Sequence, residues 1–196
     1  MEKHCLYIVL IRTSTVLSRM IHQFTKDEYT HVALSFDEEL ETMYSFGRKY
    51  TFNPFIGGFK KEEIDKGVYK LHNVVPCKII EIEVSRKQYE KARQLVNNFI
   101  SKGGSYKYNY KGLLYCALNK AACDEKRFLC SEFVYHVLKE SGIVDFKISR
   151  NLVRPQNLLN LAGRSVYQGN LKEVRCRRNS CISKGKQMGA LSAIYE

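Results

Sequence analysis

The apolar positions in the first half of the chain predict three strands. Leu6–Ile11 is an unbroken apolar run, which is typical of a strand buried on both faces. In Tyr29–Phe36, bulky apolar residues alternate with His31 and two small residues, which predicts a second strand. The acidic residues 37–39 then predict a turn, and Glu41–Phe46 predicts the returning strand of a hairpin.

The second half of the chain predicts one further strand and two helices. Cys77–Val84 ends in strict alternation of apolar and polar residues, as a half-buried strand does. Ser85 is a helix-capping residue type, and apolar side chains at helical spacing follow it until the glycine pair at 103–104. Cys130 opens the last strong helix, which ends at Gly142.

The remaining segments connect these elements. Thr13 or Ser14 could cap a helix between the first two strands. The pairs Asn53–Pro54 and Gly57–Gly58 predict a loop, and Val166–Gly169 predicts one more strand or a turn. Together the elements predict an α+β domain in which an antiparallel sheet packs against helices that are segregated from it.

Length and composition indicate an ordinary globular protein. The 196 residues are 44% hydrophobic and 27% charged, which predicts one domain over 1–171 and a basic, loosely ordered tail over 172–196. No apolar run approaches the ~20 residues of a membrane span, and the N-terminal run is short for a secretory signal, so we expect a cytoplasmic protein. Its seven cysteines are then reduced, and none has zinc-site spacing. No metal or other cofactor is expected.

The net charge of +12 suggests an acidic partner. Much of the excess lies in the tail, where residues 172–188 hold six basic residues and one acidic residue. The chain shows no RNA-binding aromatic signature and no helix-turn-helix pattern, which disfavours a nucleic-acid partner. A solvated tail is the simpler interpretation, with contact to an anionic surface as the alternative.

Cys130 is the candidate nucleophile. The N–H groups at a helix N-terminus and the positive end of the helix dipole stabilise a thiolate placed there. The same N–H groups could hold the oxyanion of a tetrahedral intermediate. The alternative is a buried structural cysteine, and the position alone does not decide between them.

His31 is the candidate base. It lies in a predicted strand beside small residues, which leave room for a substrate or a facing helix. A single histidine in a strand can equally be structural. His136 is a weaker candidate because it lies six residues after Cys130 on the same helix and points to another face.

These segments resemble the circularly permuted branch of the NlpC-like cysteine peptidases, the YiiX-like proteins of the papain-like superfamily. The resemblance covers roughly residues 5–145 and rests on Tyr29-Thr-His31, on Cys130-Ser-Glu-Phe-Val-Tyr135, and on the tyrosine-rich stretch Tyr106–Tyr110 between them. The histidine precedes the cysteine, as in the permuted members. The resemblance implies a papain-like fold in which Cys130 is the nucleophile, His31 is the base, and Tyr106 and Tyr108 bind substrate.

The resemblance also implies a third polar residue, usually a glutamate on the strand beside the histidine strand. The best match in this chain is Ser45, so the carboxylate is expected to be absent. A serine hydroxyl could accept from the imidazole and fix its tautomer, but it stabilises an imidazolium less than a charge does. The family's Gly-Asp before the first strand is missing as well.

The expected function is a cysteine hydrolase that cleaves an amide through an acyl-enzyme, on a peptide, a cell-wall-type peptide or a lipid-linked amide. One alternative is an acyltransferase or lipid hydrolase. An apolar groove for it could be lined by Phe52, Phe55, Ile56 and Phe59, although these residues could equally pack within their loop. The other alternative, which Ser45 encourages, is a non-catalytic module that binds peptides or lipids.

Overall fold

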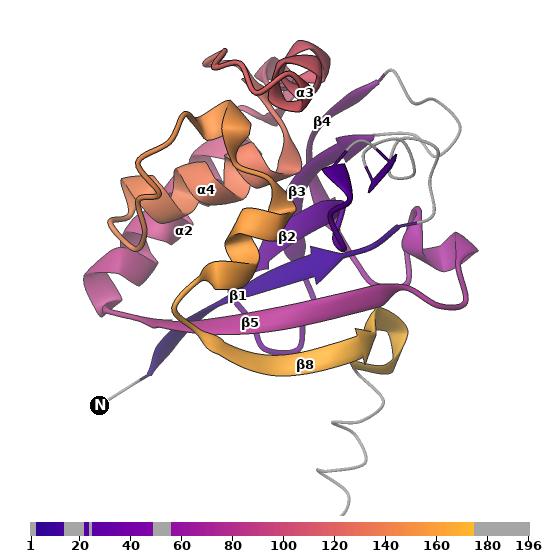
Figure 1. The fold of residues 1–196 in the computed structure, drawn as a ribbon. Helices are drawn as coiled ribbons and strands as arrows, with labels where there is room; N and C mark the ends of the chain where they lie inside the picture. The colour runs from indigo at the N-terminus through magenta and orange to yellow at the C-terminus, as the bar shows by residue number, and fades with distance from the viewer. Residues whose placement is uncertain (1–2, 14–21, 24, 49–55, 175–196) are drawn as a thin grey trace, which may run out of the picture.

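The fold is α+β, built around one eight-stranded sheet (Figure 1). The computed structural model describes residues 3–13, 22–23, 25–48 and 56–174. The helix predicted from Thr13 or Ser14 and nearly all of the basic tail fall outside this part of the chain. From edge to edge the sheet contains β7 (Arg127–Phe128), β6 (Lys107–Tyr108), β4 (Gly57–Glu62), β3 (Met43–Arg48), β2 (His31–Ser35), β1 (His4–Ile11), β5 (Pro76–Val84) and β8 (Arg164–Asn170).

The sheet is mixed. Its neighbouring strands are antiparallel except for β6 and β7, which are parallel. The expectation of an antiparallel sheet is therefore wrong at this edge. The reason is the connection between the two strands. Parallel neighbours need a crossover, and here the chain leaves β6, passes through α3 (Tyr110–Ala117) and returns to β7 in the same direction.

Two longer helices cover one face of the sheet, α2 (Arg86–Ser101) and α4 (Cys130–Glu140) (Figure 1). α2 begins where the sequence predicts it, because the Ser85 hydroxyl accepts the N–H of Gln88 in a capping box. α4 buries eight of its eleven residues, which makes it the central helix of this layer. Short 3₁₀ turns complete the described chain: η1 (Tyr69–Leu71), η2 (Gly103–Ser105), η3 (Arg150–Leu152), η4 (Pro155–Asn160) and η5 (Leu171–Glu173).

Both faces of the sheet are buried. Along β1 the side chains alternate between two cores, with Leu6, Ile8 and Leu10 under the helices and Tyr7, Val9 and Ile11 on the other side. Tyr69 of η1 and Leu171 of η5 also belong to this second core. The unbroken apolar run of β1 is therefore that of a central strand with two covered faces, as predicted.

The predicted strands that correspond to β1, β2, β3, β5 and β8 are confirmed. The predicted loop around Gly57–Gly58 is wrong, because β4 begins at Gly57. A Cβ at this glycine would lie 2.8 Å from the Cβ of Tyr108, so the missing side chain allows β4 to pack against β6. None of the helices in the described ranges has the length and apolar character needed to cross a membrane.

Candidate active site

Cys130 is the first residue of α4. It directly follows Leu129, which is extended and serves as the N-cap residue, and its side chain is buried. The N–H groups of the first helical turn have no acceptor within the helix, so the end of α4 that carries Cys130 is rich in free donors. The side chain of Cys130 lies close enough to that of His31 to raise the pKa of the imidazole.

A buried polar network fixes the chain where α4 begins. The carboxylate of Glu132 accepts the N–H of Leu129 at 2.6 Å and the side-chain amide of Asn109 at 3.2 and 3.3 Å. Asn109 in turn accepts the N–H of Gly112 at 2.8 Å, which caps α3. A Cβ at Gly112 would overlap the Asn109 side chain, so the glycine is required there. The network ties the start of α3 to the residue before Cys130.

His31 forms a buried pair with a carboxylate that comes from another strand. Its Nε2 lies 3.0 and 3.2 Å from the two carboxylate oxygens of Glu62, the last residue of β4. The side chains of His31 and Glu62 are only 15% and 3% exposed. Since β3 separates β2 from β4 in the sheet, the pair joins two strands that are not neighbours.

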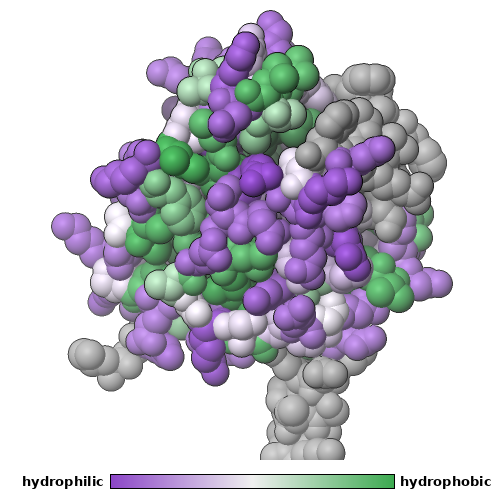
Figure 2. All heavy atoms as spheres, viewed as in Figure 1, coloured by the Kyte–Doolittle hydropathy of each residue, from purple (hydrophilic) through white to green (hydrophobic). Residues whose placement is uncertain are grey.

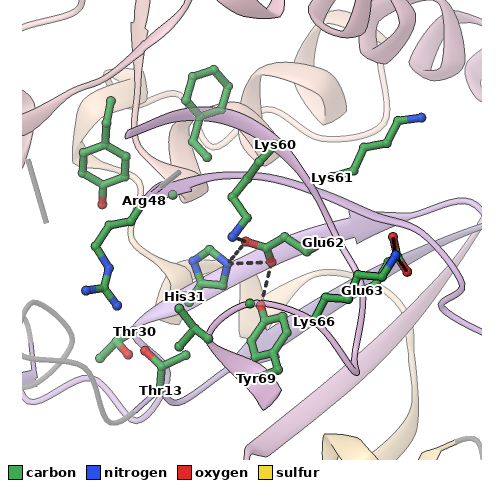
Figure 3. Close-up of a pocket in the computed structure, with 15 residues that line it drawn as sticks. Thr13, Thr30, His31, Arg48, Lys60, Lys61, Glu62, Glu63, Lys66 and Tyr69 are labelled. Atoms are coloured by element: carbon green, nitrogen blue, oxygen red, sulfur yellow. Dashed lines mark hydrogen bonds and ion pairs between the residues drawn. The ribbon is translucent and has the colours of Figure 1, made fainter. Parts of the chain in front are cut away.

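Glu62 has further partners that hold it as an anion. The hydroxyl of Tyr69 donates to it at 2.6 Å, and the ammonium of Lys60 lies 3.4 Å away (Figure 3). Burial alone would raise the pKa of Glu62. The charge of His31 and its hydrogen bond, with smaller contributions from Lys60 and Tyr69, lower this pKa to about 2.

The same pairing keeps His31 protonated. Burial lowers the pKa of the imidazole, but the Glu62 carboxylate and the neighbouring Cys130 side chain outweigh burial and raise the pKa to about 10. The site therefore combines a cysteine, a protonated imidazole and a carboxylate behind that imidazole.

Ser45 does not take the place expected for the third residue. Its hydroxyl is fully buried and donates to the backbone carbonyl of Val32 at 2.7 Å. The residue that contacts His31 is Glu62, so the expectation that a carboxylate is absent is corrected. Little in the sequence indicates Glu62, because it follows two glycines and two lysines in a segment whose pattern predicts a loop. Only Phe59 marks this segment as a buried strand.

The two expected substrate-binding tyrosines lie in different places. Tyr106 packs against Phe99, with ring centroids 4.5 Å apart, and belongs to the aromatic part of the core. Tyr108 is buried between two cavities and contributes to the lining of both. Burial raises the pKa of its phenol well above the ordinary value, so Tyr108 stays neutral.

The two cavities lie on either side of Thr30 and Tyr108, which line both. The polar cavity has a volume of about 120 Å³ and is lined by His31, Glu62 and several lysines. The apolar cavity has a volume of about 240 Å³, and Cys130 forms part of its wall. His31 and Cys130 thus line cavities of different chemistry.

An apolar groove is expected from four loop residues, two of which, Ile56 and Phe59, are described by the structure. These two residues do not line a common groove. Phe59 is buried in the core and Ile56 is 45% exposed, whereas Phe52 and Phe55 lie outside the described residues. The apolar cavity is lined instead by α3, Leu129, Val153 and Pro155. In the described ranges, no three His, Cys, Asp or Glu side chains are grouped so as to hold a metal ion.

Comparison with known proteins adds no relative to this picture. The chain matches no family model, no curated protein and no solved structure. Its function is therefore inferred from the geometry around Cys130, His31 and Glu62.

Proposed function

We propose that this protein is a cysteine hydrolase that cleaves an amide through an acyl-enzyme on Cys130. The observation that carries the proposal is the buried arrangement of Cys130, His31 and Glu62 at the N-terminus of α4. A structural cysteine needs neither a histidine partner nor a carboxylate behind that histidine. Nucleophile, base and orienting group in contact are the usual sign of covalent catalysis.

The imidazole has a separate nitrogen for each partner. Its Nε2 faces Glu62, which leaves Nδ1 for the sulfur of Cys130. The thiolate attacks the carbonyl carbon of the amide, and the first-turn N–H groups of α4 stabilise the oxyanion. As the C–N bond breaks, His31 gives its proton to the leaving nitrogen. Water, deprotonated by His31, then attacks the thioester and releases the carboxylic acid and the thiol.

The geometry also supports the inference that the fold is the permuted NlpC-like one. The histidine strand precedes the nucleophile helix in the chain, and the third residue is a glutamate, as the resemblance implies, although it comes from β4 and not from the strand next to β2. The alternative function, a non-catalytic module that binds peptides or lipids, depends mainly on the absence of a carboxylate beside His31. Glu62 removes that argument.

The test is acyl-enzyme formation with a small activated ester, p-nitrophenyl acetate, followed by intact mass and peptide mapping. We expect one acetyl group on Cys130, formed much more slowly in His31→Ala and not at all in Cys130→Ala. Cys123, an exposed cysteine elsewhere in the chain, serves as the internal reference for an unactivated thiol. If Cys130 reacts no faster than Cys123, or equally fast in His31→Ala, the proposal is wrong.

A further inference from the structure

A third cavity lies at the end of the sheet that is remote from the candidate active site. It has a volume of about 560 Å³, and its wall comes from the first half of β1, from β5, β8 and α2, and from the turn after β2. His31 pairs with Ile11, the last residue of β1, which is roughly 24 Å along the strand from His4. Figure 2 shows mostly hydrophilic side chains where β1 begins, at the lower left of the view. The cavity is therefore a separate, polar space.

On one side of this cavity a guanidinium is held by aromatic rings. The guanidinium of Arg93, on α2, lies 5.9 Å from the ring centroids of both Phe36 and Tyr89. The imidazole of His4 stacks on Tyr89 with a centroid distance of 5.1 Å. In the part of the chain that the structure describes, Arg93 forms no ion pair with a carboxylate. A stacked guanidinium keeps the N–H donors at its edge available, and these donors match two oxygens of a phosphate group.

The other side of the cavity carries two carboxylates. Glu81 is only 8% exposed, and its oxygens accept hydrogen bonds from Arg164 at 3.0 Å and from the Tyr7 hydroxyl at 3.3 Å. Burial and the charges of Glu38 and Glu81 raise the pKa of Tyr7, so Glu38 lies on this side as well. Carboxylate oxygens have several lone pairs and accept from hydroxyl groups, as they do from the ribose of bound nucleotides.

The cavity therefore has a positive and a negative end. Arg164 is paired with Glu81, and Lys3 lies 2.9 Å from Glu83 in an exposed pair, so Arg93 is the cation of the wall whose charge no described carboxylate offsets. A cationic ligand group is disfavoured beside Glu81, because Arg164 already lies there. A ligand that fits both ends has an anionic group for Arg93 and uncharged hydrogen-bond donors for the carboxylates.

We propose that this cavity binds a phosphorylated sugar, either free or as part of a ribonucleotide. Its phosphate lies on Arg93, with the imidazole of His4 beside it, and its hydroxyl groups donate to Glu38 and Glu81. The volume of the cavity is in the range of sites for small molecules. Because the site contains neither Cys130 nor His31, it goes beyond the proposed function and does not depend on it.

The first experiment is isothermal titration calorimetry of the whole chain with ribose 5-phosphate, adenosine monophosphate, ribose and inorganic phosphate. We expect at least one phosphorylated sugar to bind, and ribose and inorganic phosphate to bind at least about tenfold more weakly, because each of them reaches only one end of the cavity. Tighter binding of adenosine monophosphate identifies a nucleotide, whereas equal or tighter binding of ribose 5-phosphate identifies a free sugar phosphate. If neither phosphorylated sugar binds, or if inorganic phosphate binds as tightly as both, the proposal is wrong.

Two pairs of variants locate the ligand. Arg93→Gln should weaken binding of the phosphorylated sugar by at least about tenfold, whereas Arg86→Gln, at an exposed arginine of the same helix outside the cavity wall, should leave it unchanged. Glu38→Gln should weaken binding, and Glu39→Gln, at the next exposed residue and outside the wall, should not. Equal effects within either pair would overturn the assignment of that end of the cavity.

A second readout needs no variant. Cys5 lines the cavity and is partly buried, so a bound ligand should slow its alkylation by iodoacetamide. Peptide mapping compares this rate with that of Cys123, which is exposed and lies outside the cavity wall. Selective protection of Cys5 supports the site, and equal alkylation of Cys5 with and without a saturating phosphorylated sugar overturns it.

Discussion

The two sides of the candidate site differ in how they hold their key residue. His31 lies within a polar network in which the Glu62 carboxylate contacts His31, Lys60 and Tyr69. Cys130 lies on an apolar wall, and its position is fixed through the backbone of the preceding residue, Leu129, whose N–H donates to Glu132. The difference separates two tasks: one side controls protonation, and the other side controls where the sulfur lies and what approaches it.

The largest effect on activity and stability is expected for His31→Ala, which removes the imidazolium from the charged side of the site. His31→Ala removes the base, so acylation of Cys130 should fall by about 10²- to 10⁴-fold. It also leaves Glu62 buried without its main partner, which should cost about 3 kcal/mol in the free energy of unfolding. Urea denaturation and p-nitrophenyl acetate kinetics measure both. The double variant His31→Ala/Glu62→Gln should regain stability but not activity, and recovery of activity would contradict the role of His31.

Glu62→Gln tests the carboxylate while keeping its shape. Without the negative charge the pKa of His31 falls from its raised value, so the imidazolium is lost at lower pH. The alkaline limb of the kcat/KM profile should therefore move down by at least about one pH unit. NMR titration of the His31 ring provides an independent measurement. An unchanged alkaline limb would show that Glu62 is structural.

The paired charges also predict how stability depends on pH. The raised pKa of His31 contributes stability that is complete below its ordinary 6.5 and is lost as the pH rises towards about 10. The lowered pKa of Glu62 contributes stability that is present above its ordinary 4.5 and is lost as the pH falls towards about 2. The pair therefore stabilises most between pH 4.5 and 6.5. Urea midpoints measured between pH 2 and pH 10 should show a maximum in this window, and the maximum should be flattened in His31→Ala/Glu62→Gln.

On the other side, Glu132→Gln should disturb the position of Cys130 without changing its base. A glutamine can still accept the N–H of Leu129, but its amide group then faces the amide of Asn109, donor against donor. We expect a loss of about 1–3 kcal/mol in stability and a fall in acylation rate with no shift of the alkaline limb. A shift of that limb would mean that the two sides are not separate.

The smallest effect is expected for Ser45→Ala. This substitution removes one buried hydrogen bond to the Val32 carbonyl, at a cost of about 1 kcal/mol. Since Ser45 does not contact the imidazole in the structure, the pH profile should be that of the wild type. A moved profile would return Ser45 to the role that the sequence suggested.

The sequence predicted those parts of the fold that have a clear apolar period. β1, α2 and α4 follow from an apolar run, a capping serine and a helical stripe, and Cys130 and His31 stand out because of the elements on which they lie. β4 has two glycines and three charged residues around Phe59, so neither the strand nor Glu62 could be recognised. The contact between His31 and Glu62 depends on tertiary pairing through β3, which no local pattern encodes.

This pairing through β3 has a consequence for folding. Because side chains alternate along a strand, a slip of β4 by one residue would turn Glu62 to the opposite face of the sheet, away from His31. Phe59 would leave the core in the same slip. Reactivity at Cys130 would then report the register of β4. A misfolded chain with the right helices but a shifted β4 would not react at Cys130. Titrating the reactive thiol would thus count correctly registered molecules in a preparation.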